Sequence, residues 1–136
     1  MNVTVLVMDD SIVVRDRIVE ILSEVPGVNR VLQAGDTQSA VELISKYQPP
    51  IIILDIQVPG TAEMRNGIDV LKWTRSHFVQ SQIIMLSNFD IPRYRDACMA
   101  AGAYRFFDKS SDFEQLPVVI ADLLSGSTAI EINNIL

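Results

Sequence analysis

The sequence is poor in cysteine, in histidine and in positive charge. Its single cysteine, Cys98, excludes a disulfide framework and a four-thiolate metal site. Eleven lysines and arginines stand against seventeen aspartates and glutamates, which gives a formal net charge of −6. Because nucleic-acid-binding domains are usually basic, we expect no direct binding of DNA or RNA by this chain.

Long apolar segments and targeting signals are also missing. The clearest apolar run, Ile51–Leu54, is only four residues long, whereas a membrane-spanning helix needs roughly 20 residues. The N-terminus has neither the basic start nor the small-residue cleavage site of a secretory signal. We therefore expect a protein without a membrane segment that works in the reduced environment of the cytoplasm.

The composition favours one folded domain. The chain has 136 residues, of which 49% are hydrophobic and 21% are charged, and these values exclude a disordered chain. At this length a folded chain buries roughly 70% of the surface that it would otherwise expose, so its core can form without disulfides.

Short apolar segments alternate with helical patterns along the chain. Five predicted strands are Val3–Met8, Arg30–Ala34, Ile51–Leu54, Ile83–Leu86 and Tyr104–Phe107. A helical stripe of apolar residues follows each of them, within residues 14–25, 40–47, 68–73, 92–101 and 116–124. A capping box is predicted at Ser111–Glu114, before the last helix, and Cys98 is expected to pack in the core. Strict alternation predicts an α/β fold with a parallel sheet covered by helices on both faces.

Residues suited to phosphate or metal chemistry follow four of the five predicted strands. They are Asp9 and Asp10 after the first strand, Asp55 after the third, Ser87 after the fourth and Lys109 after the fifth. In open parallel sheets, ligands bind beyond the carboxyl ends of the strands, so we expect these side chains to share one site.

Three carboxylates in one place repel each other unless a cation lies among them. Oxygen ligands of this kind suit Mg²⁺, and the charges of three carboxylates, one Mg²⁺ ion and Lys109 sum to zero. Asp55 leaves the most hydrophobic strand and is the expected nucleophile towards phosphorus. Lys109 and the metal would neutralise the phosphoryl oxygens, and Ser87 would donate a hydrogen bond to one of them.

This set of residues resembles the receiver domain of two-component response regulators. The order of the five residues matches that family, and Ala101-Gly102-Ala103 before Phe106 resembles its approach to the fifth strand. The resemblance covers residues 3–124 and implies a flavodoxin-like (βα)5 doubly wound sheet of five strands in the order 2-1-3-4-5. Residues 1–124 are the expected receiver domain. Residues 125–136 would then be a C-terminal tail or the start of a linker to an output domain.

The resemblance implies roles for the matching positions. Asp55 would be the phosphoacceptor, and Lys109 would bind the phosphoryl group together with Ser87. Mg²⁺ would be held by Asp9, Asp10 and Asp55 and by the backbone carbonyl of Gln57. Ser87 and Phe106 would form the conformational switch, although Phe106 suits plain core packing equally well. Gln57 and Phe89 would tune the lifetime of the acyl phosphate.

Two local features depart from the family pattern. A glycine is usual about eight residues after the phosphoacceptor, but Gly67 comes four residues later, so Gly60–Asn66 resembles a short insertion beside the site. It would contact a partner or simply lengthen a surface loop. The residue after Lys109 is Ser110, where proline is frequent, and this leaves the conformation of the Lys109–Ser110 peptide bond open.

The resemblance implies a signalling switch and not a metabolic enzyme. A histidine kinase or phosphotransfer protein would phosphorylate it, and a downstream protein or a tethered output domain would read the change. The chain would fit the receiver part of a DNA-binding transcriptional regulator. A homodimer through the 92–101 helix, the fifth strand and the last helix is a further expectation.

Three other interpretations stay open at this stage. A Mg²⁺-dependent phosphohydrolase with an aspartyl nucleophile would need a general acid near Asp55 and a substrate cap, but position 57 is Gln and no cap-sized insertion exists. A receiver-like binding module that takes no phosphate would not need the complete set of site residues. Asp9 and Asp10 would, in isolation, be read as caps of the following helix.

Overall fold

Five parallel strands form one sheet in the order β2-β1-β3-β4-β5. The structure, a computed structural model, describes residues 2–89 and 91–135, with side chains described as far as residue 126. The strands are β1 (Val3–Met8), β2 (Val28–Ala34), β3 (Ile51–Asp55), β4 (Gln82–Ser87) and β5 (Arg105–Asp108). This topology confirms the predicted fold class and strand order.

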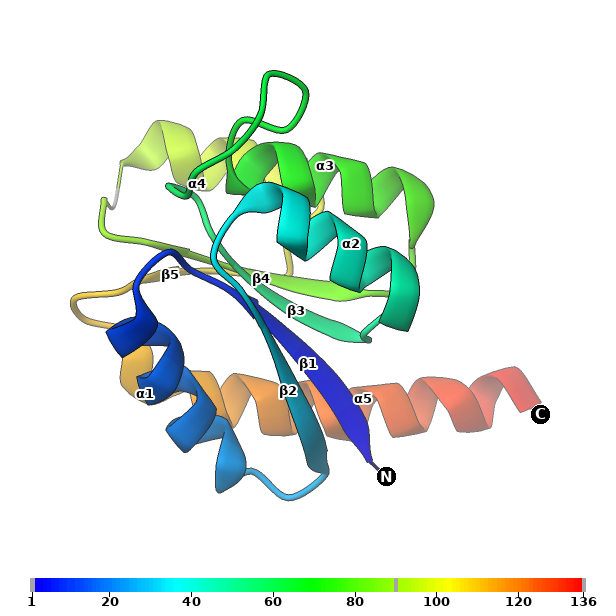
Figure 1. Ribbon diagram of the computed structural model, residues 1–136. Coiled ribbons are helices and arrows are strands. Elements are labelled where there is room, and N and C mark those ends of the chain that lie inside the picture. Colours follow the sequence, from blue (N-terminus) through cyan, green and yellow to red (C-terminus); the bar gives the residue numbers. More distant parts are fainter. Residues whose placement is uncertain (1, 90, 136) are drawn as a thin grey trace.

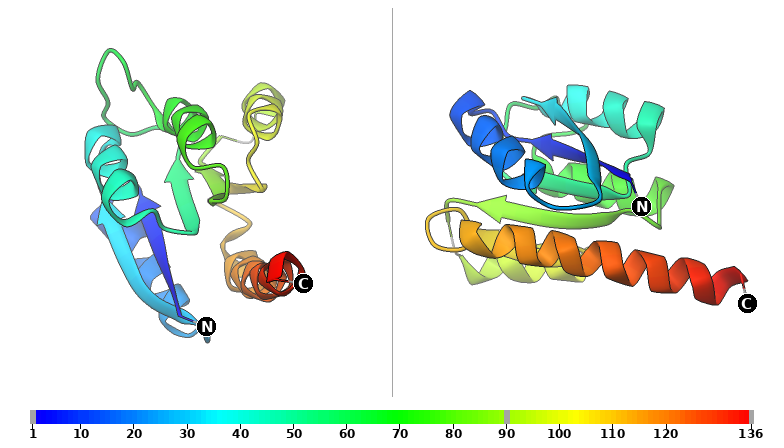
Figure 2. Two further views of the ribbon diagram at one scale, coloured as in Figure 1. Left: turned by 90° about the vertical axis from the view of Figure 1, so that its right-hand side faces the viewer. Right: turned by 90° about the horizontal axis from the view of Figure 1, so that it is seen from below.

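Helices cover both faces of the sheet. They are α1 (Ile12–Ser23), α2 (Thr37–Tyr47), α3 (Gly67–His77), α4 (Pro92–Ala100) and α5 (Leu116–Ile135), with a short 3-10 turn, η1 (Phe113–Gln115), before α5. Figures 1 and 2 show α2, α3 and α4 on one face and α1 and α5 on the other. In the described part of the chain, no helix combines the length and the hydrophobicity that crossing a bilayer requires.

The central strand is buried on both faces, as its unbroken apolar sequence predicts. Every residue of β3 is buried, and its successive side chains point into two separate cores. One core contains Leu6, Met8, Ile52 and Leu54, and the other contains Val5, Val7, Ile51 and Ile53. Burial of β1 and β3 in the middle of the sheet fixes the positions of the polar residues at their ends.

Polar caps start three of the helices close to the ends of the strands. Ser11 caps α1 by accepting a hydrogen bond from Val14 N, and Asp36 caps α2 by accepting one from Ser39 N. Asn66 caps α3 in the same way. Because Ser11 is the residue that caps α1, the capping interpretation does not account for Asp9 and Asp10.

The predicted capping box at Ser111–Glu114 is wrong. Asp112, not Ser111, precedes the 3-10 turn, which has no side-chain cap. The Ser111 hydroxyl instead donates to Asp112 Oδ1 at 3.4 Å, and Asp112 Oδ2 accepts from Asp108 N at 2.8 Å. The Asp112 carboxylate therefore binds the backbone at the end of β5.

Element boundaries also differ from the sequence prediction. β2 begins at Val28, two residues early, because the exposed edge of the sheet has a weak hydrophobic pattern. The backbone of residues 125–135 belongs to α5, and a linker role for residues 125–136 stays a prediction. No cis peptide bond occurs in the described residues, so the Lys109–Ser110 bond is trans.

Cys98 packs in the core, as expected from its place on the apolar side of α4. It is fully buried in the cluster that contains Met85 and Phe106. Burial raises the pKa of its thiol from 9.0 to about 11, because the thiolate loses its hydration.

The native protein should therefore react slowly with thiol reagents. The pKa shift lowers the thiolate population near pH 8 by roughly 100-fold, and burial restricts access as well. We expect little reaction of Cys98 with dithionitrobenzoate at pH 8 and complete reaction after unfolding in urea. Rapid stoichiometric labelling of the native protein would contradict the buried position.

Candidate functional site

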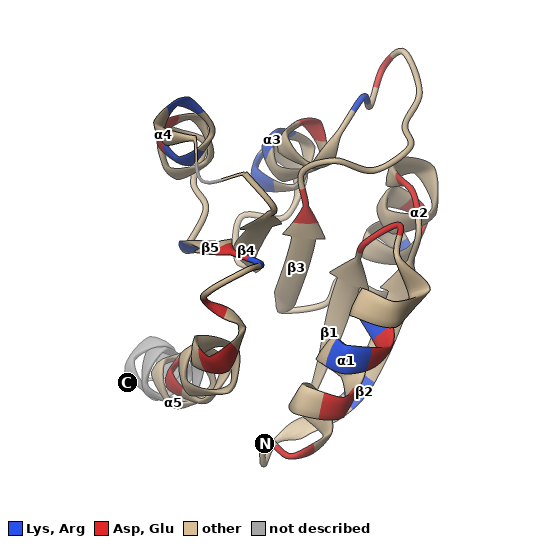
Figure 3. Cartoon of the chain, turned by 90° about the vertical axis from the view of Figure 1, so that its left-hand side faces the viewer, with Lys and Arg blue, Asp and Glu red and all other residues tan. Residues whose placement is uncertain are grey.

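The polar ends of the strands meet at one edge of the sheet. Met8 pairs with Leu54 across β1 and β3, and Ser87 pairs with Asp108 across β4 and β5. The residues that end or follow these strands are therefore neighbours in space. Figure 3 views this edge and shows acidic segments at the ends of β1 and β3, with a basic segment near the end of β5.

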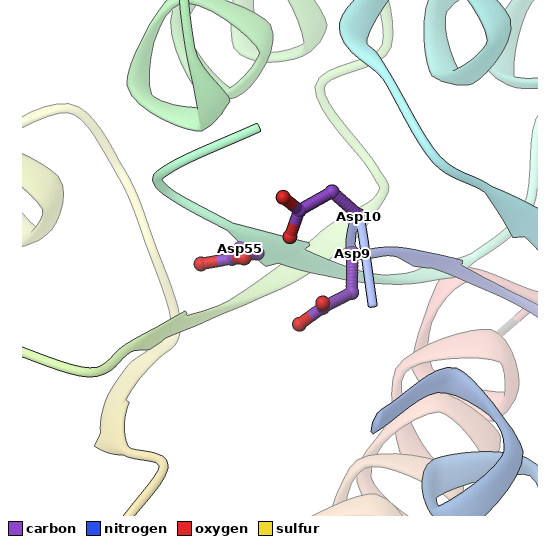
Figure 4. Close-up of side chains that lie close together, drawn as sticks. All are labelled: Asp9, Asp10 and Asp55. Carbon is purple, nitrogen blue, oxygen red and sulfur yellow. The ribbon is translucent and has the colours of Figure 1, made fainter. Parts of the chain in front are cut away.

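Asp9, Asp10 and Asp55 form an acidic cluster. One carboxylate oxygen from each residue lies within 4.8 Å of the others. Asp9 and Asp55 are buried, whereas Asp10 is exposed. In Figure 4, Asp9 and Asp10 leave the end of β1 and their side chains share one space with that of Asp55 from β3. The structure thus brings together the three carboxylates that the sequence predicts to meet.

Lys109 lies between the two buried carboxylates. Its Nζ is 2.5 Å from Asp9 Oδ2 and 2.9 Å from Asp55 Oδ2. The Lys109 side chain is 7% exposed, so these ion pairs form largely away from water. Its backbone N–H donates to Ser87 O at 2.8 Å, which fixes the residue at the end of β4.

Burial dominates the electrostatics of Asp55. It raises the pKa of this carboxyl from 3.8 to about 6, although the hydrogen bond and charge of Lys109 act in the opposite direction. The neighbouring charge of Asp9 raises it further. Burial alone would lower the pKa of Lys109, but the hydrogen bonds and charges of Asp9 and Asp55 outweigh it and raise that pKa. The amine therefore stays positively charged beside Asp55.

Backbone groups orient the two buried carboxylates. Asp9 Oδ1 accepts from Ser11 N at 2.8 Å, and Asp55 Oδ1 accepts from Gln57 N at 3.3 Å. Arg15 Nη1 on α1 donates to the carbonyl of Asp9 at 2.6 Å. Sequence reasoning missed Arg15, because an arginine on an amphipathic helix is usually a solvated charge and its acceptor here is a backbone carbonyl.

Ser87 and Phe89 form one hydrogen-bonded unit. The buried Ser87 Oγ accepts from Phe89 N and donates to Phe89 O, both at 3.0 Å. The hydroxyl is thus engaged with the loop after β4. The Phe89 side chain is 48% exposed. Its effect on the lifetime of a phosphoryl group stays a prediction.

Phe106 is a core residue with a charged neighbour. Its side chain is 4% exposed, and the Arg95 guanidinium lies 4.8 Å from the centre of its ring. Arg95 Nη1 also donates to Phe106 O at 3.3 Å. The ring is packed inward, which suits both interpretations of this residue, and its role as a switch stays a prediction.

Gly67 packs against the backbone of the residue that carries the candidate nucleophile. A Cβ at Gly67 would overlap the carbonyl oxygen of Asp55, so a side chain cannot be accommodated there. Gly67 N also donates to Ile56 O at 2.8 Å. Gly60–Asn66 therefore adds length without moving this glycine away from Asp55.

The comparisons with known proteins identify the family. Residues 5–121 match the sequence profile described as the response regulator receiver domain. The nitrate/nitrite response regulator protein NarP of Escherichia coli is 32% identical over 123 residues, which cover 90% of this chain and 55% of NarP. The Fimbriae Z protein of Salmonella typhimurium is 30% identical over 123 residues, 90% of this chain and 57% of that protein. The chain thus spans just over half the length of these relatives.

Solved structures agree with the sequence matches. The isolated REC domain of RcsB from Salmonella enterica serovar Typhimurium, determined in the presence of the phosphomimetic BeF3-, superimposes with a TM-score of 0.85 at 25% identity. That match covers 93% of this chain and 91% of the RcsB chain. From its sequence, its sheet topology and these matches, the chain belongs to the response regulator receiver domain family.

Proposed function

We propose that this chain is a phosphorylation-dependent signalling switch whose phosphoacceptor is Asp55. The observation that carries the proposal is the position of Lys109, whose amine contacts both Asp9 and Asp55 within a cluster of three carboxylates. A histidine kinase or a phosphotransfer protein is the proposed phosphodonor.

The acidic cluster fits a divalent cation. Three carboxylates and one ammonium group leave a net charge of −2, and the ligand atoms are all hard oxygens. Asp9, Asp10 and Asp55 would hold Mg²⁺ together with the backbone carbonyl of Gln57. When bound, the ion would supply positive charge to the phosphoryl oxygens.

The residues of the chain account for the transfer step. A carboxylate oxygen of Asp55 attacks phosphorus, and the bond from phosphorus to the donor breaks as the leaving group takes the electron pair. Lys109, already 2.9 Å from Asp55 Oδ2, neutralises charge that develops on the phosphoryl oxygens. Hydrolysis of the acyl phosphate later restores Asp55, so the chain catalyses only its own phosphorylation and dephosphorylation.

Ser87 connects the phosphoryl group to the surface. A charged phosphoryl oxygen is a stronger acceptor than the Phe89 carbonyl to which the hydroxyl now donates. Turning the hydroxyl towards the phosphoryl group would release the loop between β4 and α4. Phe106 lies on the next strand and would respond to that release. Gln57 and Phe89 are the proposed tuners of the phosphoryl lifetime.

The face formed by α4, β5 and α5 is the proposed output surface. Its exposed side chains include Met99 on α4 and Arg105 on β5. A second copy of the chain, a downstream protein or a tethered output domain would bind there. RcsB structures include one bound to the promoter rprA, and by analogy residues 125–136 would lead to a DNA-binding domain in the cytoplasm.

The proposal predicts a labile covalent adduct on Asp55. Incubation with Mg²⁺ and acetyl phosphate should add one phosphoryl group, measured by intact mass, and Asp55→Asn should abolish it. Lys109→Met should slow the reaction by about 100-fold, since it removes a preorganised charge from the transition state. The exposed-residue variant Asp122→Asn should react like the wild type.

Other outcomes of the same experiment separate the alternatives. Rapid multiple turnover without accumulation of an adduct would favour a phosphohydrolase. Absence of any adduct in the wild-type protein would favour a module that takes no phosphate.

The raised pKa of Asp55 predicts how this residue makes the stability of the folded protein depend on pH in the absence of Mg²⁺. Its pKa is higher in the folded state, about 6 against 3.8, so the folded protein binds more protons between these values. The contribution of Asp55 to stability should therefore fall as the pH rises from about 4 to about 6, by up to about 3 kcal/mol.

The variant Asp55→Asn removes this loss. In EDTA at pH 7 it should be more stable than the wild type in urea unfolding, and the difference should shrink towards pH 4. Asp122→Asn is the matched control at an exposed site. A wild-type protein as stable as Asp55→Asn at pH 7 would contradict the electrostatic account.

A further inference from the structure

We propose that Thr37, the first residue of α2, is a positioning residue for the loop that follows Asp55. Thr37 would hold this loop so that the Gln57 backbone keeps its place beside the Asp55 carboxylate. The metal-binding part of the inference rests on the proposed function, whereas the positioning of the loop does not.

Thr37 ties α2 to both sides of the inserted loop. Its backbone N–H donates to Pro59 O at 3.0 Å, and its Oγ1 donates to Met64 O at 2.8 Å. The residue is fully buried although it is polar. In Figures 1 and 2 the loop between β3 and α3 lies beside the start of α2. One threonine thus joins segments that are more than 20 residues apart in the sequence.

The loop is closed by its own hydrogen bonds. Thr61 N donates to Met64 O at 2.9 Å, and Met64 N donates to Thr61 Oγ1 at 3.1 Å. Arg65 forms an ion pair with Asp69 at 3.0 Å. The Met64 carbonyl accepts from both Thr61 and Thr37, which uses both of its lone pairs. The Gly60–Asn66 segment is therefore held by hydrogen bonds within itself and to Thr37.

The loop is connected to Asp55 at both ends, through the backbone at one and by a direct contact at the other. Pro59 is two residues from Gln57, whose N–H donates to Asp55 Oδ1. At the other end, Gly67 packs on the Asp55 carbonyl. A shift of the loop at Pro59 or Met64 is therefore passed to groups that orient Asp55. The hydroxyl of Thr37 acts through this backbone and does not need to touch the reacting atoms.

The variant Thr37→Val tests this role because it keeps the shape of the side chain and removes the hydroxyl donor. Thr37→Ser keeps the donor and should restore the wild-type behaviour. Thr74→Val is the matched control, since Thr74 is equally buried and its Oγ1 donates to Val70 O at 2.7 Å within α3. It removes the same type of hydrogen bond without touching the loop.

The first measurement is amide hydrogen exchange of the metal-free full chain. In Thr37→Val, the amides of Gln57 and of residues 61–65 should exchange roughly two- to tenfold faster, as expected for the loss of one hydrogen bond. Thr37→Ser and Thr74→Val should match the wild type in this segment. Unchanged exchange in Thr37→Val, or equal acceleration in Thr74→Val, would overturn the proposal.

The second measurement is Mg²⁺ affinity by calorimetry. Thr37→Val should bind Mg²⁺ about three- to tenfold more weakly, because a group that orients the ligands is displaced. Thr74→Val should keep the wild-type affinity, and wild-type affinity in Thr37→Val would overturn the positioning role. A wild-type protein that binds no Mg²⁺ would contradict the proposed function, and hydrogen exchange alone would then decide the role of Thr37.

Discussion

The two ion pairs of Lys109, with Asp9 and with Asp55, are the interactions on which this edge of the sheet depends. Two buried carboxylates so close together would be strongly unfavourable without a positive charge between them. Lys109 supplies that charge from the end of the edge strand β5, 100 residues along the chain from Asp9. The order of the parallel strands is what makes the contact possible, because β1 and β3 are adjacent and β4 links them to β5.

Lys109 offsets only part of the cost of burying the Asp55 carboxylate. The pKa of Asp55 stays raised to about 6 despite its contact with Lys109. The cluster of three carboxylates therefore favours additional positive charge, which under the proposed function would accompany the phosphoryl group. In the proposed function, the same arrangement would link ion binding and phosphorylation to the Ser87 hydrogen bonds with the loop before α4.

Much of the fold and the site could be predicted from the sequence, because the apolar strands and the polar residues that follow them are recognisable without a structure. Unbroken apolar strands such as β3 are typical of a central parallel sheet, and the residues that follow them must share an edge. Asp9, Asp10, Asp55 and Lys109 were predicted to meet on that basis. The role of each residue in phosphoryl transfer rests on the family resemblance and remains a proposal.

The contacts that sequence reasoning missed are those between side chains and backbone. Thr37 and Arg15 donate to carbonyl groups whose positions depend on the whole fold, and any residue can provide a carbonyl. The capping box is wrong for a related reason, since the Ser111 hydroxyl donates to the Asp112 carboxylate, which also accepts from Asp108 N. In the sequence, the Gly60–Asn66 segment is notable only for its length. Its hydrogen bond to Thr37 of α2 depends on the folded structure.

The most direct test of this account is a double-mutant cycle between Lys109 and Asp55. Urea unfolding of the wild type, Lys109→Met, Asp55→Asn and the double variant, in EDTA at pH 7, gives the coupling between the two side chains. The account predicts a favourable coupling of about 1 kcal/mol or more, since the pair is buried and in direct contact. A coupling near zero would show that Lys109 does not hold the two carboxylates together.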